Sequence, residues 1–102
     1  MEPENFKEIR VKLPGDLFET ITPGEIVYLL LDKALSKAEY YLSKCHEFEE
    51  KYQLSLTDFK KKIEENKDEI FADWDNLLIW EGYELAYQEW EKKYKELKSC
   101  RE

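Results

Sequence analysis

Few of the side chains that commonly carry chemistry are placed to work together in this chain. The only histidine, His46, lies between Cys45 and Glu47. On a helix, adjacent side chains point about 100° apart, so these three groups cannot easily share a metal ion or a proton. The pair Asp73 and Asp75 has the spacing of a weak Mg²⁺ site, but acidic residues at a helix start explain it more simply.

The motifs of several enzyme classes are missing from the chain. It has no E-x-x-H pair of a di-iron bundle, no glycine-rich phosphate loop and no G-x-S-x-G turn. We therefore expect a protein that is not an enzyme and that uses no cofactor and no metal ion.

The charge composition narrows the class of protein further. The 102 residues carry a net charge of −8, and Arg10 and Arg101 are the only arginines among sixteen basic residues. A stand-alone nucleic-acid binder is disfavoured, because neutralisation of phosphates supplies most of the affinity in that class. The 42% apolar content is enough for one modest core, and three glycines and three prolines favour long helices over a many-stranded sheet.

The chain shows no signal for export or membrane insertion. No run of about 18 apolar residues is present, and the first residues are acidic where a signal peptide would be basic. We expect a cytoplasmic protein that does not contact membranes. Cys45 and Cys100 have no spacing typical of a disulfide framework, so we expect reduced thiols.

The N-terminal part of the chain has the pattern of a strand. After a polar tail at residues 1–6, residues 7–13 read KEIRVKL and alternate polar and apolar side chains. This period of two is typical of a half-buried β-strand. Pro14 and Gly15 end it, and a short apolar segment of about one helical turn follows.

A capping box then predicts the start of a long helix at residues 23–53. Thr22 supplies the N-cap hydroxyl, Pro23 the first helical position and Glu25 the acidic third position. An apolar stripe with alternating spacings of four and three runs along this helix, as expected for one helix packed along another. Its members are Val27, Leu31, Ala34, Ala38, Tyr41, Cys45, Phe48 and Tyr52.

A short helix is predicted at residues 56–66. Ser55 with Asp58 gives a weaker cap, and Leu56, Phe59 and Ile63 share one apolar face. The opposite face is charged and reads as a solvated surface. In the linker that follows, we expect Ile70 and Phe71 to pack into the core.

The third predicted helix, residues 74–99, carries apolar residues on two faces. One stripe consists of Trp80, Tyr83, Tyr87, Trp90, Tyr94 and Leu97. Trp74, Leu78 and Leu85 project roughly 150° from the centre of that stripe. The first half of this helix is thus apolar on two faces and must be covered twice, whereas its second half is apolar on one. Gly82 in its middle favours close approach by a neighbouring backbone.

Together these elements predict a mainly α protein with a single domain at residues 1–102. Two long helices and one short helix form a small bundle, with a possible short β-strand at residues 7–13. The relative direction of the two long helices stays open. An antiparallel pair would separate Cys45 from Cys100 by about 25 to 30 Å, whereas only a parallel pair would bring them together.

The aromatic residues of the third helix have two interpretations. They are either the core of the bundle or anchors for another protein, since Trp and Tyr are enriched among residues that dominate interface energetics. Glu81, Glu84, Glu89 and Glu91 add a negative field suited to a basic partner. The candidate partner-binding residues are Trp74, Leu78, Trp80, Tyr83, Leu85, Tyr87 and Trp90.

The order of these blocks resembles a family of small antitoxins from archaeal and cyanobacterial toxin–antitoxin pairs. The resemblance rests on "EIRVKLP", "TPGEIVYLLLDKALSKAEYYLSKCHEFEEKY", "LSLTDFKKKIEE" and "DWDNLLIWEGYELAYQEW", and covers about residues 7–97. It implies a protein that binds a cognate toxin, commonly a small ribonuclease, and holds it inactive through the long helices.

Antitoxins of this kind often carry an N-terminal DNA-binding element. Here "KEIRVKLP" looks similar to the strand of a ribbon-helix-helix dimer, with Arg10 and Lys12 as candidate nucleic-acid contacts. The following segment, GDLFETI, is too short for the first helix of that fold, and the acidic net charge also argues against DNA binding. Two further hypotheses stay open: a homodimeric helical scaffold, and an acidic inhibitor that mimics nucleic acid.

Overall fold

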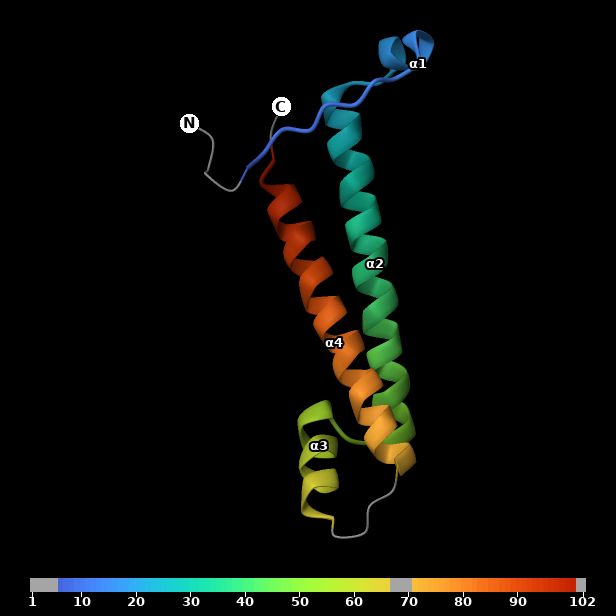
Figure 1. Cartoon of the computed structure of the whole chain (residues 1–102), viewed down its shortest axis with the longest axis vertical. Coiled ribbons are helices and arrows are strands. Elements are labelled where there is room, and N and C mark those ends of the chain that lie inside the picture. The colour runs from blue at the N-terminus through green and yellow to red at the C-terminus, as the bar shows by residue number, and fades with distance from the viewer. Residues whose placement is uncertain (1–5, 67–70, 101–102) are drawn as a thin grey trace.

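The structure of the protein, a computed structural model, describes residues 6–66 and 71–100, and every regular element in these ranges is a helix. In chain order these are α1 (Gly15–Thr20), α2 (Pro23–Tyr52), α3 (Leu56–Glu65) and α4 (Phe71–Lys98). The long helices α2 and α4 lie side by side and antiparallel, and α3 packs beside the first half of α4 (Figure 1). The predicted mainly α class is thus confirmed, and the direction of the two long helices is antiparallel.

Capping residues explain why α2 and α3 begin at the predicted positions. The Thr22 side-chain oxygen accepts a hydrogen bond from the Glu25 backbone N–H (3.1 Å), and the Ser55 hydroxyl accepts one from the Asp58 N–H (3.2 Å). Each satisfies a backbone donor that the first helical turn leaves unpaired. Helix α4 begins at Phe71, three residues before the predicted position.

The N-terminal segment packs little against the rest of the chain. Residues 6–14 have no regular secondary structure, and α1 contains no buried residue. Ile9 is 87% exposed and Val11 67%. Because a strand requires a second strand for its backbone hydrogen bonds, and the described residues provide none, the strand at residues 7–13 stays a prediction.

The core lies at the end of the hairpin where α2, α3 and α4 meet. Phe48 of α2 stacks on Trp80 of α4 with ring centroids 5.5 Å apart, and Tyr52 stacks on Phe59 of α3 at 4.1 Å. Full burial of one large apolar side chain contributes about 1.5 to 3 kcal/mol. The residues of this cluster that are almost fully buried are Cys45, Phe59, Ile63, Leu77 and Trp80.

The other half of the hairpin is thin. Among the described residues there, Ala34 and Ala38 are the only buried ones, because small side chains let α2 approach the aromatic stripe of α4 closely. The molecule measures 63 × 30 × 20 Å, and its radius of gyration is 19.8 Å. A compact chain of this length would have a radius of about 13 Å, so much apolar surface stays exposed.

Two local expectations fail within the chain. Phe71 does not pack into the core, since its side chain is 78% exposed; Ile70 lies outside the described residues. A Cβ atom added to Gly82 would meet no heavy atom within 4 Å. Within residues 6–66 and 71–100, no backbone therefore approaches α4 at that glycine.

Candidate functional site

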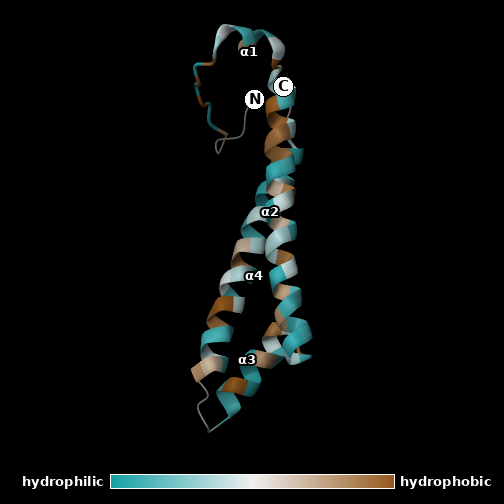
Figure 2. Cartoon of the chain, turned by 90° about the vertical axis from the view of Figure 1, so that its right-hand side faces the viewer, coloured by the Kyte–Doolittle hydropathy of each residue, from teal (hydrophilic) through white to brown (hydrophobic). Residues whose placement is uncertain are grey.

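An apolar surface without cover lies on the side of α4 that points away from α2. Its residues are Phe71, Trp74, Leu78 and Leu85, which are 78%, 37%, 67% and 61% exposed. Their spacing of three, four and seven places them on one helix face. We call these four residues the outer face of α4. Figure 2 shows the apolar stretch of α4 near its start, and a second one near the start of α2.

The outer face exists because apolar residues occupy more of the circumference of α4 than the other helices of the chain can cover. Helix α2 covers the stripe that begins at Trp80, and α3 covers Leu77 through Phe59 and Ile63. Leu78 lies about 100° further round the helix, beyond the reach of both. The described residues therefore cover one of the two apolar faces of α4 and leave the other exposed.

The candidate partner-binding residues fall into three groups in the structure. Trp74, Leu78 and Leu85 lie together on the outer face. Tyr83, Tyr87 and Trp90 are half-buried along the seam with α2, and Trp80 is buried in the core with 1% of its surface exposed. Sequence reasoning missed Phe71 as a member of the outer face and Leu77 as a member of the core.

The charges of the molecule are unevenly divided between its two ends. The end that carries α3 and the outer face, residues 38–66 and 71–85, has eleven acidic and five basic side chains. The remaining described residues have eight acidic and nine basic ones. The negative charge is therefore concentrated at the end of the molecule that carries the outer face of α4.

Acidic side chains flank the outer face at close range. Glu81 forms a long ion pair with Lys60 of α3 (4.0 Å). Within the described part of the chain, Asp75 and Glu89 have no basic group within 4.0 Å. These two carboxylates are therefore available to a lysine or arginine of another molecule.

The one thiol in the core is not suited to nucleophilic chemistry. Burial and the nearby Glu84 carboxylate, whose oxygen lies 3.5 Å from the Cys45 Sγ, raise the pKa of Cys45 to about 12. A thiol with such a pKa is almost entirely protonated at neutral pH, and the thiolate is the reactive form. His46 next to it is exposed and points elsewhere.

The other candidate ligands do not converge either. Across residues 6–66 and 71–100, no three His, Cys, Asp or Glu side chains are placed to hold a metal ion. None of the helices in that part of the chain is long and apolar enough to cross a membrane. Arg10 and Lys12 lie exposed on the N-terminal segment, at the opposite end of the molecule from the outer face.

No protein-family model, curated protein or solved structure matches this chain. The feature of this protein that points to a function is its surface, an exposed apolar helix face in the acidic half of the molecule.

Proposed function

We propose that this protein is a binding module without enzymatic activity, an antitoxin that neutralises a basic cognate toxin through the outer face of α4. The observation that carries the proposal is the exposure of Phe71, Leu78 and Leu85 on one face of a regular helix. Isolated exposed apolar residues are common, but an aligned set is typical of an interaction site.

The composition of this surface matches the anatomy of protein interfaces. Trp74 and Phe71 provide aromatic anchors, with Leu78 and Leu85 continuing the apolar centre. Asp75 and Glu89 supply a polar rim. Binding energy is concentrated in central residues of this kind, while the charges at the rim increase the association rate and select the partner.

The negative field favours a partner with a basic surface. A small ribonuclease needs positive charge to bind the phosphates of RNA. An acidic module that covers this positive surface would block access of RNA, which is how binding alone could neutralise such a toxin. The resemblance of the sequence blocks to antitoxins supports this identity, and a cytoplasmic location would follow from that role.

The test uses the reading frame that neighbours this protein's own. Expression of the neighbour alone should arrest growth, and co-expression of this protein should relieve the arrest. Leu78→Glu should abolish the relief because it places a charge in the centre of the outer face. The matched control is Leu29→Glu, at a leucine on α2 that is 63% exposed and distant from the outer face.

Two results would overturn the proposal. A neighbouring protein that does not impair growth leaves no toxin to neutralise. Full relief by the Leu78→Glu variant, with normal expression of the folded protein, would place the contact elsewhere.

A further inference from the structure

A second apolar surface lies along one edge of the seam between α2 and α4. Tyr28, Leu35 and Leu42 follow each other at intervals of seven along α2, beside the residues that face α4. Together with Tyr87 and Tyr94 of α4 they line two adjoining hollows of about 310 and 150 Å³. We call these five residues the open flank.

The spacing on α2 distinguishes a bundle helix from a two-stranded coiled coil. A helix that packs on one partner needs apolar residues at two positions of each heptad, whereas a helix in the core of a bundle uses three. Tyr28, Leu35 and Leu42 occupy that third position over the first two-thirds of α2. This part of α2 therefore has the pattern of a helix with more than one neighbour.

Helix α3 packs on the same side of the hairpin as the open flank. At the core end, α3 lies against Leu77 of α4. Glu84 and Glu91 follow Leu77 at intervals of seven, so they continue along the same side of α4. Past the end of α3 this side is uncovered, and there it becomes the open flank. The side of the hairpin that α3 covers at the core end therefore continues without cover towards the other end of the molecule.

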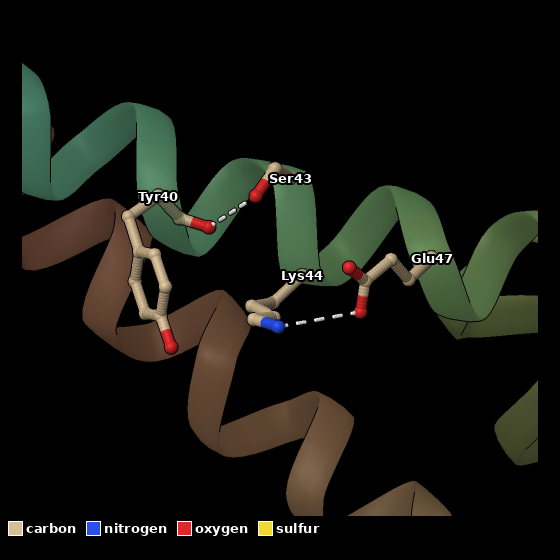
Figure 3. Close-up of polar contacts among 4 residues, drawn as sticks. All are labelled: Tyr40, Ser43, Lys44 and Glu47. Carbon is tan, nitrogen blue, oxygen red and sulfur yellow. Dashed lines mark hydrogen bonds and ion pairs between the residues drawn. The ribbon is translucent and has the colours of Figure 1, made fainter.

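The opposite side of the seam has a hollow of about 360 Å³ near the start of α2, but Phe6 of the same chain already lines it. The middle of α2 on that side is polar. There Lys44 lies 5.5 Å from the centroid of the Tyr40 ring and pairs with Glu47 at 3.6 Å (Figure 3). The Ser43 hydroxyl donates to the Tyr40 carbonyl oxygen at 2.7 Å. These polar side chains complete their contacts within α2, so the middle of this side presents no apolar row to another helix.

The chain exposes more area than a compact monomer of its mass. The chain exposes 8832 Å², whereas a folded monomer of its mass, 12.4 kDa, exposes about 6,100 Å². The excess is about 2,700 Å². Obligate homodimers bury about 2,000 to 5,000 Å² over both chains. Half of that area is less than the excess of one chain, so a dimer can form and still leave the outer face of α4 exposed.

The two walls of the open flank also carry charged side chains, including Asp32 and Glu39 on the α2 wall. Glu91 precedes Lys95 and Lys98 on the wall that α4 contributes. Glu91 already pairs with Lys95 of its own helix at 2.8 Å, so when two such walls lie antiparallel, Lys98 is the lysine that comes near Glu91 of the other copy. Two copies joined through the outer face of α4 would oppose acids such as Asp75 and Glu89.

We propose that the open flank binds the open flank of a second copy, antiparallel, so that the two hairpins form a four-helix bundle. In this arrangement Leu35, the middle residue of the α2 row, packs on the same residue of the second copy near the two-fold axis. Tyr28 of one copy then approaches Leu42 of the other. The outer faces of both α4 helices stay free.

Sedimentation equilibrium of the full chain tests the proposal, with helicity from circular dichroism as the check of folding. We expect a mass of twice 12.4 kDa for the natural protein, and dissociation to monomers at least tenfold easier for Leu35→Glu. Leu78→Glu should remain dimeric although it loses binding to the toxin, so failure of this inference is distinguishable from failure of the proposed function. A monomeric natural protein at millimolar concentration, or an undiminished Leu35→Glu dimer, would overturn the inference.

A cross-linking variant tests the register even where Leu35→Glu fails to fold. Leu35→Cys is placed in a Cys100→Ser background and oxidised with oxidised glutathione, which accepts the two electrons as the two thiols form a disulfide. Cys45 does not compete, because it is buried. We expect a covalent dimer from Leu35→Cys and none from the control Leu29→Cys. Cross-linking at the control but not at Leu35→Cys would contradict the arrangement.

Discussion

Leu77 and Leu78 are neighbours in α4, but only 2% of the Leu77 surface is exposed, against 67% of Leu78. The first packs in the cluster formed with α2 and α3, and the second points away from both. Leu77→Ala should therefore lower the free energy of unfolding by about 2 to 5 kcal/mol. Leu78→Ala should change it by less than about 0.5 kcal/mol. Urea denaturation of both variants measures the difference, and equal losses would contradict this division of α4.

The hydroxyl of Tyr52 joins α2 to the start of α4. It donates a hydrogen bond to Asp73 Oδ1 (3.2 Å) and accepts one from Asn76 Nδ2 (2.6 Å). Tyr52→Phe leaves both partners without this group and should cost about 1 to 3 kcal/mol of unfolding free energy.

The matched control for Tyr52→Phe is Tyr40→Phe, at a ring that is 50% exposed on the same helix. Removal of this exposed hydroxyl should change the stability by less than about 0.5 kcal/mol. Equal midpoints of chemical denaturation for the two variants would show that the hydroxyl of Tyr52 does not hold α4 in place.

Because the Cys45 thiol is buried, we expect the free energy of unfolding to fall at alkaline pH. Burial, with the Glu84 carboxylate beside it, raises the pKa of Cys45 from 9.0 to about 12, so the folded state holds the proton more tightly than the unfolded state. The stabilisation is present below pH 9 and is lost as the pH rises from 9 towards 12. Between pH 8.5 and pH 10.5 the loss should be about 2 kcal/mol.

Other groups also titrate in that pH range, so the test compares two proteins. Denaturation at both pH values is measured for the natural chain and for Cys45→Ala. The variant is expected to be less stable at pH 8.5 but to lose less between the two values. Parallel losses in both proteins would mean that Cys45 does not cause the effect.

Local sequence signals predicted the helices well because each signal acts within one turn. Thr22 and Ser55 cap α2 and α3 as expected. The seam of α2 follows the stripe that includes Ala34, Ala38 and Cys45, which are the three buried residues of this helix. A pattern of this kind determines which face of a helix is apolar, and the structure shows α2 buried on that face.

The arrangement of faces on α4 was harder to predict. Leu77, Leu78 and Ile79 form a continuous apolar run, so periodicity does not show which of them α3 covers. Only the position of α3 buries Leu77 and leaves Leu78 exposed. The antiparallel direction of the long helices also depends on the path of the chain through α3.

The two proposed surfaces are compatible with each other. The open flank and the outer face occupy different sides of the hairpin, so a dimer formed through the first leaves the second free in both copies. The assembly would then carry two toxin sites. Light scattering of the purified complex should give two chains of each protein, and a complex with one toxin per dimer would contradict the independence of the sites.

Calorimetric titration of this protein with the product of the neighbouring reading frame tests the central claim most directly. The natural chain and Leu78→Glu are titrated under the same salt conditions, with Leu29→Glu as the control for surface charge. We predict that Leu78→Glu weakens binding by about 100-fold or more, the loss expected for a central interface residue, while the control binds as the natural chain does. Equal affinity of Leu78→Glu and the natural chain would contradict the assignment of the outer face of α4 as the toxin-binding surface.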